Sequence, residues 1–215
     1  MNISILCSDE NHPVNPWLKN WMVLNEHEHG IKLLRKADEM EEGDILFLIS
    51  CHEILTKRHR DNFRHCLILH ASSLPEGRGM SPHKWQILEG KEELTLTLLS
   101  AEDKLDSGHI WAQFPIQLDG TELFDEINEK IFKAEIQAMS WTVKNIDSAS
   151  PHPQSGVSTY FRRRTPSDSK LDPNKTIAEQ FNLLRVSDPN RYPAFFEING
   201  CKYKIFLERY DEYKK

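Results

Sequence analysis

The sequence predicts an α/β fold in which helices cover both faces of an open sheet. Two observations support this prediction. Short apolar runs with strand character alternate along the chain with segments of helical spacing. One of these runs, residues 45–49, reads Ile-Leu-Phe-Leu-Ile without interruption, which is typical of a strand that is buried on both faces of a parallel sheet.

The first predicted elements are a strand over residues 2–7 and a helix over residues 16–24. Asn15 suits the N-cap of this helix, and Pro16 suits its first position, where a proline loses no hydrogen bond that the helix would make. A buried strand over residues 45–50 follows, opened by a Gly-Asp pair.

The next segments predict a short charged helix over residues 56–63 and a second buried strand over residues 66–70. Ser81 and Pro82 together are a strong signal for the start of a helix. We expect this helix to run to Leu88, before Gly90.

A hairpin and the longest helix come next. Residues 94–99 alternate Leu and Thr as a strand does, and residues 108–115 are predicted as their hairpin partner. Residues 121–143 predict the longest helix of the chain. Its apolar residues recur at helical spacing, at Leu123, Ile127, Ile131, Ala134 and Ala138.

The C-terminal part begins with residues 147–158, which are rich in Ser, Pro and Gly and are predicted as a connection. A helix over residues 175–186 and a hairpin over residues 194–207, turning on Asn199-Gly200, follow it. We therefore expect a main domain over residues 1–150 and a C-terminal helix and hairpin region over residues 151–215.

Charge is distributed unevenly between these two parts. The net charge is −6, but the segment from residue 158 onward holds 12 Lys and Arg against 8 Asp and Glu, about +4, so that the rest carries about −10. An acidic body argues against a nucleic-acid binder, which usually shows a basic stripe. The modestly basic end suits a small molecule that bears phosphate.

Other features narrow the class of protein. The longest apolar runs fall far short of a membrane span, so we expect no membrane association. The four cysteines are widely spaced, without a Cys-x-x-Cys pair, which favours reduced thiols and the cytoplasm. His27 and His29 lie two residues apart in a polar segment; without a third ligand they indicate a surface cluster, and no metal site is predicted.

Two segments place polar residues where an open α/β sheet binds ligands, which is at the carboxyl ends of its strands. Residues 70–82 follow a buried strand and read His-Ala-Ser-Ser-Leu-Pro-Glu-Gly-Arg-Gly-Met-Ser-Pro. Residues 100–110 form the loop between two strands and include Glu102, Asp103 and Asp106. These two segments are the candidate functional site.

The same two segments resemble the formyltransferases that use 10-formyltetrahydrofolate. In that family a strand ends in Asn-x-His, Pro-Ser-Leu-Leu-Pro-x-x-Arg-Gly follows, and a later loop ends in Leu-Asp-x-Gly-x-Ile. The residues that match are His70, Ser72, Leu74, Pro75, Arg78, Gly79 and Pro82 in the first motif, and Leu105, Asp106, Gly108 and Ile110 in the second. Further matches at residues 160–166 and 192–196 are similar to the branch that acts on nucleotide sugars, which itself resembles methionyl-tRNA formyltransferase.

The resemblance implies a Rossmann-like formyltransferase sheet with flanking helices over residues 1–150 and a short C-terminal α+β appendage. It also implies roles for two side chains. His70 is expected to act as the acid/base and to stabilise the oxyanion, because imidazole suits both tasks near neutral pH. Asp106 is expected to orient His70 and to tune it.

One position departs from the family pattern. The catalytic Asn of the family lies two residues before the histidine, on the same side of the strand, and here that position is Ile68, which donates no hydrogen bond. Loss of an oxyanion donor typically lowers turnover ~100- to 1000-fold. Ser50 and His52, at the end of the neighbouring strand, are the candidates to replace it.

The resemblance also implies where the folate and the acceptor bind. The folate is expected along the turn after the strand over residues 45–50 and along the loop before Asp106, where backbone groups hold the pterin in the family. The residues of these two places are Ser50, Cys51, His52, Glu53, Ile54, Leu99, Ala101, Glu102 and Asp103. Substrate phosphate is expected at arginines, since guanidinium pairs well with phosphate. These arginines are Arg78, Arg162, Arg163 and Arg164, although a solvated edge strand is an equally good interpretation of the last three.

The substrate that fits best is the amino group of a UDP- or dTDP-linked 4-amino-deoxy sugar, in the synthesis of surface-glycan precursors. The acidic net charge and the short segment after the linker argue against transfer RNA as the acceptor. Three alternatives stay open: a formylation domain of the peptide-synthetase type, a hydrolase of 10-formyltetrahydrofolate, and a module that binds folate or nucleotide sugar without turnover. The oligomeric state is not predicted.

Overall fold

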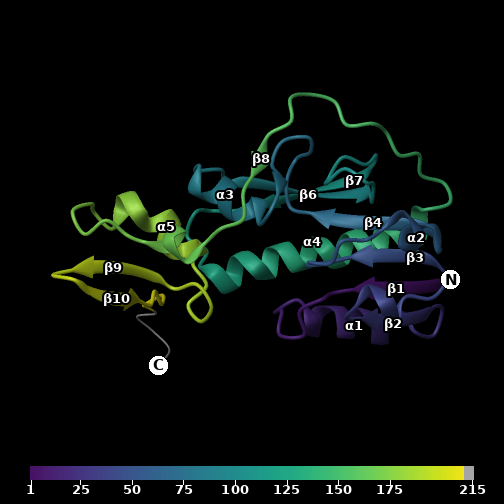
Figure 1. The fold of residues 1–215 in the computed structure, drawn as a ribbon, viewed down its shortest axis with the longest axis horizontal. Coiled ribbons are helices and arrows are strands. Elements are labelled where there is room, and N and C mark those ends of the chain that lie inside the picture. The colour runs from purple at the N-terminus through teal and green to yellow at the C-terminus, as the bar shows by residue number, and fades with distance from the viewer. Residues whose placement is uncertain (211–215) are drawn as a thin grey trace.

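A six-stranded sheet forms the centre of the protein in a computed structural model that describes residues 1–210. Its order is β2-β1-β3-β4-β6-β7 (Figure 1). The strands are β1 (Asn2–Leu6), β2 (Gly30–Leu34), β3 (Gly43–Leu48), β4 (Phe63–His70), β6 (Glu93–Ser100) and β7 (Ile110–Gln117). The first four pair in parallel, whereas β6 pairs antiparallel with both β4 and β7. The result is a mixed α/β sheet.

Helices flank this sheet, as predicted. The long helix α4 (Phe124–Asn145) crosses the sheet next to α1 (Asn15–Asn25), and Trp21 Nε1 of α1 donates to Ser140 Oγ of α4 at 2.9 Å (Figure 1). A large apolar cluster lies between these helices and one face of the sheet, with Phe47 and Leu67 fully buried in it. A second, smaller apolar cluster includes Leu46 and Leu48 of β3, whose side chains alternate with that of Phe47. The short helix α2 (Lys57–Asp61) packs against β4.

After α4 the chain returns to the segment that follows β4. The two-residue strand β8 (Tyr160–Phe161) pairs in parallel with β5 (Arg78–Gly79), which precedes α3 (Pro82–Leu88). Two 3-10 helices, η2 (Pro166–Ser169) and η3 (Ala178–Gln180), lead to α5 (Phe181–Val186) and to a hairpin of β9 (Ala194–Ile198) and β10 (Cys201–Ile205). Figure 1 shows this region beside the beginning of α4.

Most predicted elements are present with shifted ends, and four differ. The predicted helix over residues 175–186 begins later than expected: residues 178–180 form the 3-10 helix η3, and the α-helix α5 begins at Phe181. The reason is the Gln180 side chain, whose Oε1 accepts from the Asp172 amide at 2.7 Å and whose Nε2 donates to three carbonyls of this turn. The strand β2 was not predicted; it is a short edge strand that carries Lys32.

The other two differences concern caps and the charged helix. Neither Asn15 nor Ser81 caps its helix through its side chain. Asn15 is the first residue of α1 and donates Nδ2 to the carbonyls of three earlier residues, while Ser81 adopts φ 50°, outside the usual cap conformation. The charged helix ends at Asp61, because Phe63 begins β4.

Among residues 1–210, no helix combines the length and the apolar character that crossing a membrane requires. The cysteines are free thiols; Cys7 is buried, Cys51 and Cys66 are partly buried, and Cys201 is exposed on the hairpin. Burial raises the pKa of the Cys66 thiol to about 12, which makes it unreactive.

Candidate functional site

His70 is the last residue of β4 and is nearly buried at the edge of the sheet, with 7% of its surface exposed. Its Nε2 lies 2.9 Å from the carbonyl oxygen of Gly77. Because a carbonyl only accepts, this contact places a proton on Nε2. The Nδ1 atom lies 3.7 Å from Asp106 Oδ1, within ion-pair distance but longer than a hydrogen bond. The imidazole is thus held between a backbone carbonyl and a carboxylate.

Asp106 is held in place from two sides. Its Oδ2 accepts the backbone N–H of Gly79 at 2.9 Å, and its own carbonyl accepts from Gln154 Nε2 at 2.8 Å. Its backbone is left-handed, with φ 49°. These contacts fix the carboxylate, so that Oδ1 is the oxygen that faces the imidazole.

Two glycines make this arrangement possible. A Cβ on Gly79, whose φ is 101°, would lie 2.2 Å from the carbonyl oxygen of Phe161, and a Cβ on Gly108 would lie 1.9 Å from that of Ser100. Both are far inside van der Waals contact, so only glycine fits. The Gly-containing motifs therefore bring β5, β8 and the loop after β6 together around Asp106.

The turn that follows β3 lies next to the end of β4 in the sheet. Ser8 fixes the backbone of this turn. Its Oγ accepts the amide of His52 at 2.9 Å and lies 3.5 Å from the carbonyl oxygen of Ser50. Glu53 accepts the amide of Ala37, the first residue of the 3-10 helix η1 (Ala37–Glu39), at 2.5 Å, so this carboxylate is already paired. The Ile54 side chain is 91% exposed. The turn thus offers backbone groups and one free apolar side chain.

The loop after β6 borders β4 on the other side. The Leu99 side chain is fully buried, and the amide of Ala101 donates to the carbonyl of Cys66 at 2.8 Å. Glu102 and Asp103 are exposed, and Asp103 forms an ion pair with Arg60. The turn and this loop therefore lie on the two sides of β4.

Ile68 occupies an apolar environment. It is partly buried and packs against a cluster of Leu74, Leu99 and Ile110. The structure therefore places hydrocarbon at the position where the resembling family carries its amide.

The four predicted substrate arginines do not form one cluster. Arg78 donates to Gln154 Oε1 at 2.6 Å, beside Asp106. Arg162 forms a double contact with the Asp168 carboxylate and holds the pKa of that group well below its usual range. Arg164 donates to the carbonyl of Asp168 at 2.9 Å, and Arg163 is exposed.

Sequence reasoning missed several polar side chains close to this site. Gln154 lies in the predicted connection and bridges Arg78 to the Asp106 loop. Burial lowers the pKa of His12 to about 4 and that of His83 to about 3, so both are neutral near pH 7. The only signal for His83 was its position directly after the Ser81-Pro82 motif.

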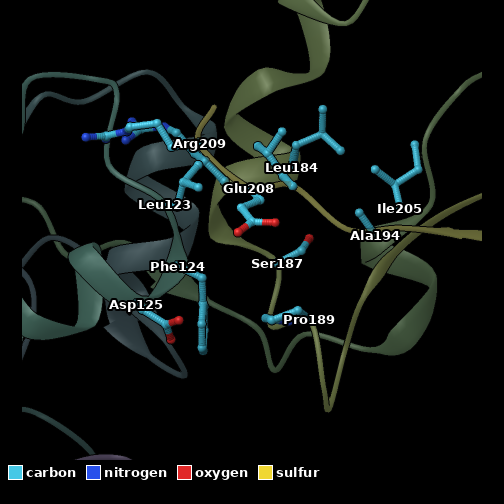
Figure 2. A pocket seen from close by; sticks show the side chains of 12 residues that line it. Leu123, Phe124, Asp125, Leu184, Ser187, Pro189, Ala194, Ile205, Glu208 and Arg209 are labelled. Atoms are coloured by element: carbon cyan, nitrogen blue, oxygen red, sulfur yellow. The ribbon is translucent and has the colours of Figure 1, made fainter. Parts of the chain in front are cut away.

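Two pockets are each lined in part by residues of the C-terminal region. One of about 200 Å³ is shown in Figure 2, with Phe124 and Asp125 from the start of α4 facing Ser187 and Pro189 from the segment after α5. The other, about 320 Å³, is lined by Gly77, whose carbonyl contacts His70, and by Tyr160 and Phe161 of β8. Within residues 1–210, no group of three or more His, Cys, Asp or Glu side chains is arranged to hold a metal ion.

Comparison with known proteins relates this geometry to one family. The sequence model of the family described as formyl transferase matches residues 8–143. Methionyl-tRNA formyltransferase from Bacillus subtilis (strain 168) is 28% identical over 196 residues, covering 84% of this chain and 61% of that protein. The chain spans about three fifths of the length of the curated relatives it matches first.

Solved structures share the fold at low identity. A methionyl-tRNA formyltransferase from Clostridium thermocellum is 22% identical with a TM-score of 0.80, covering 94% of this chain and 90% of that chain. HypX from Aquifex aeolicus in complex with tetrahydrofolic acid is 17% identical with a TM-score of 0.80, covering 95% of this chain and 37% of that chain. A sugar N-formyltransferase from Shewanella sp. FDAARGOS_354 is 16% identical with a TM-score of 0.73, covering 96% of this chain and 97% of that chain.

The family match extends from the loop after β1 into α4 and contains both His70 and Asp106. It covers well over half of the chain, including the motif glycines Gly79 and Gly108. The chain therefore belongs to the formyl transferase family.

Proposed function

We propose that this chain transfers a formyl group from 10-formyltetrahydrofolate to the amino group of a UDP- or dTDP-linked 4-amino-deoxy sugar. The observation that carries the proposal is the nearly buried His70–Asp106 pair at the carboxyl edge of the sheet, inside the family match. In this proposal residues 1–150 form the catalytic domain and residues 151–215, of which the last five lie outside the described part, help to bind the acceptor.

The donor supplies the formyl carbon that the acceptor amine attacks. His70 then has two tasks. Its Nε2–H, which now donates to the carbonyl of Gly77, turns to the formyl oxygen and protonates the oxyanion, and Nε2 then accepts the proton that leaves the amine. Asp106 holds the ring in place and stabilises its charged form. As tetrahydrofolate leaves, Nε2 passes the amine proton to the folate nitrogen and takes up the proton of the intermediate's hydroxyl group.

The turn after β3 and the loop after β6 fit a folate. We propose that Ser50 to Ile54, with Leu99, Ala101, Glu102 and Asp103, hold it mainly through backbone groups, because Leu99 is buried and Asp103 is paired with Arg60. The exposed Ile54 side chain would pack on the flat pterin ring, which accounts for an isoleucine with 91% of its surface exposed.

Two features favour a nucleotide sugar as the acceptor. The acidic net charge of −6 disfavours a polyanion such as transfer RNA. The fold is shared with a sugar N-formyltransferase over 96% of this chain, although methionyl-tRNA formyltransferases share it as well. A reaction on free nucleotide sugars is expected in the cytoplasm.

The test is a mass-spectrometric assay of the full chain with 10-formyltetrahydrofolate and a panel of UDP- and dTDP-amino sugars. We expect one sugar to gain one formyl mass, and His70→Ala to abolish this gain, while His109→Ala, on the exposed side of the same region, keeps it. Formate release without an amine would indicate the hydrolase instead.

Ile68 favours a second candidate, a module that binds folate without turnover, because its apolar packing leaves no amide at the oxyanion position. The variant Ile68→Asn distinguishes the two. If wild-type turnover is limited by the absent donor, the variant raises it by up to ~100-fold. Folate binding without any turnover in both proteins would contradict the proposed enzyme.

A further inference from the structure

Gln154 lies in the connection between α4 and β8, and its side chain reaches back to the loop that carries Asp106. The backbone of His152 pairs with that of Ile110 at the start of β7, with N–O distances of 2.8 and 2.9 Å, and this pairing places Gln154 beside the loop that precedes β7. The Nε2 atom of Gln154 donates to the carbonyl oxygens of Asp106 and Gly108 at 2.8 and 2.9 Å. One amide group therefore holds two carbonyls of the same loop.

Arg78 determines which way this amide faces. Its Nη2 donates to Gln154 Oε1 at 2.6 Å, which is the only side-chain hydrogen bond of Arg78 within residues 1–210. Because a guanidinium only donates and a carbonyl only accepts, the amide oxygen has to face Arg78 and the NH2 group has to face the loop. A flipped amide would set its NH2 group against the guanidinium and its oxygen against two carbonyls. The orientation of the amide is thus fixed from both sides.

The loop needs this support, because the backbone of Asp106 is left-handed, with φ 49°. Residues other than glycine seldom adopt this conformation, and it persists where surrounding contacts hold it. The direction of the carboxylate follows from the backbone: Oδ2 accepts the amide of Gly79 at 2.9 Å, and Oδ1 lies 3.7 Å from His70 Nδ1. If the backbone relaxed, the carboxylate would turn away from the imidazole.

We propose that Gln154 and Arg78 are positioning residues of formyl transfer. Arg78 orients the Gln154 amide, and the amide keeps Asp106 in the conformation in which its carboxylate faces His70. This inference rests on the proposed function, and it gives Arg78 a part other than binding substrate phosphate.

The first test is steady-state kinetics of formyl transfer by the full chain, with the sugar that the mass-spectrometric assay identifies. Gln154→Leu removes the amide, and Gln154→Glu keeps the acceptor for Arg78 but loses the donor to the loop. Both should lower kcat about 10- to 100-fold with KM nearly unchanged, because misplacing a reacting group by about 1 Å costs on that scale. Gln117→Leu, an exposed glutamine that bonds Glu93 at the end of β7, is the matched control.

The Arg78 variants test the orientation of the amide. Arg78→Met should lower kcat in the same direction as Gln154→Leu, because the amide is then free to flip. Arg78→Lys keeps a group that only donates to Oε1 and should retain most of kcat. Equal losses in the two Arg78 variants would mean that Arg78 acts in another way.

A double-variant cycle with Asp106→Asn separates positioning from a general loss of activity. If Gln154 acts through the Asp106 carboxylate, Gln154→Leu should lower kcat by less than about 2-fold in the Asp106→Asn background. A full additional fall in that background would overturn the inference.

Amide hydrogen exchange, followed by NMR without substrates, tests the support of the loop directly. The amide of Gly79 donates to the Asp106 carboxylate, whereas the amides of its neighbours Arg78 and Met80 donate to backbone carbonyls at and just before β8. Gln154→Leu should speed the exchange of the Gly79 amide about 10-fold and leave the two neighbouring amides unchanged. Faster exchange at all three amides would indicate a general loosening of the segment. That result, or an unchanged Gly79 amide, contradicts the inference.

The two proposals fail separately, because amide exchange needs no turnover. A protein that formylates no sugar, while Gln154→Leu frees the Gly79 amide alone, would overturn the proposed function and leave the support of Asp106 by Gln154 standing. Formyl transfer with wild-type kcat in Gln154→Leu would do the reverse.

Discussion

At the scale of single residues, the pairing of His70 with Asp106 is the feature on which the chemistry depends. The carboxylate reaches the imidazole only because Gly79 donates to its other oxygen and Gln154 holds its backbone. The separation of 3.7 Å shortens to a hydrogen bond if either group moves by less than 1 Å, which substrate binding commonly causes.

Asp106→Asn tests this role. The amide keeps the size of the side chain and can still accept from Gly79, but it removes the charge that stabilises the protonated imidazole. We expect kcat for formyl transfer to fall ~100-fold or more, with KM for the sugar substrate nearly unchanged. Steady-state kinetics measure both, and Asp147→Asn, an exposed pair with Arg64, is the control. A variant with wild-type kcat would remove Asp106 from the mechanism.

The motifs predicted some residues of the site from the sequence and missed others. His70, Asp106 and their glycines were found because each motif is continuous in sequence. Gln154 lies in the predicted connection and gains its part in the site only from its contacts with Arg78 and with the Asp106 loop. Spacing along the chain carries no information on such a contact.

At the scale of elements, a buried ion pair connects the C-terminal region to the main domain. Arg185 of α5 lies 3.4 Å from Glu122 in the segment before α4, and their side chains are 2% and 4% exposed. Glu122 also accepts the amides of Asp119 and Gly120 and pairs with Lys130. The position of α5 against the start of α4 therefore depends on the buried ion pair between Arg185 and Glu122.

Arg185→Met should destabilise the protein by about 1.5 to 3 kcal/mol, the usual worth of a hydrogen bond to a charged group, because Glu122 keeps Lys130 as a partner. Urea unfolding followed by tryptophan fluorescence measures the change in free energy of unfolding. The double variant Arg185→Met with Lys130→Met should be less stable still, because Glu122 is then left buried without a cation. An unchanged unfolding midpoint in the single variant would show that α5 docks by apolar contacts alone.

The elements predicted best are those whose pattern dominates their local sequence. The apolar run of β3 and the helical spacing of α4 each specify one structure. The strand β2 is half exposed at the sheet edge and so lacks a continuous apolar signal. The turn before α5 depends on four side-chain hydrogen bonds of Gln180, which no propensity rule anticipates.

At the scale of the whole molecule, the pH dependence of stability combines the effects of several buried titratable groups, which act in opposite directions. His12 and His83 have folded pKa values of about 4 and about 3, below the ordinary 6.5. The unfolded chain therefore binds more protons than the folded protein up to pH 6.5, and these histidines make stability rise with pH. Glu135 of α4 acts in the opposite direction: burial raises its pKa from 4.5 to about 8, and its Oε2 has no partner within residues 1–210.

Because the folded protein keeps the Glu135 proton between pH 4.5 and pH 8 while the unfolded chain loses it, this residue makes stability fall across that window. Glu135→Gln mimics the protonated acid and removes the dependence. The variant should match the wild type at pH 4.5 and exceed its free energy of unfolding by about 2 to 3 kcal/mol at pH 7.

Comparing variant with wild type at each pH cancels the histidine contributions, which both proteins share. Urea unfolding at pH 4.5, 6 and 7 gives the difference directly, and Glu129→Gln on the exposed side of the same helix is the control. A difference that stays constant with pH would mean that Glu135 is ionised in the folded protein, and a partner for its charge would then have to lie close to Cys7, the group with which it interacts.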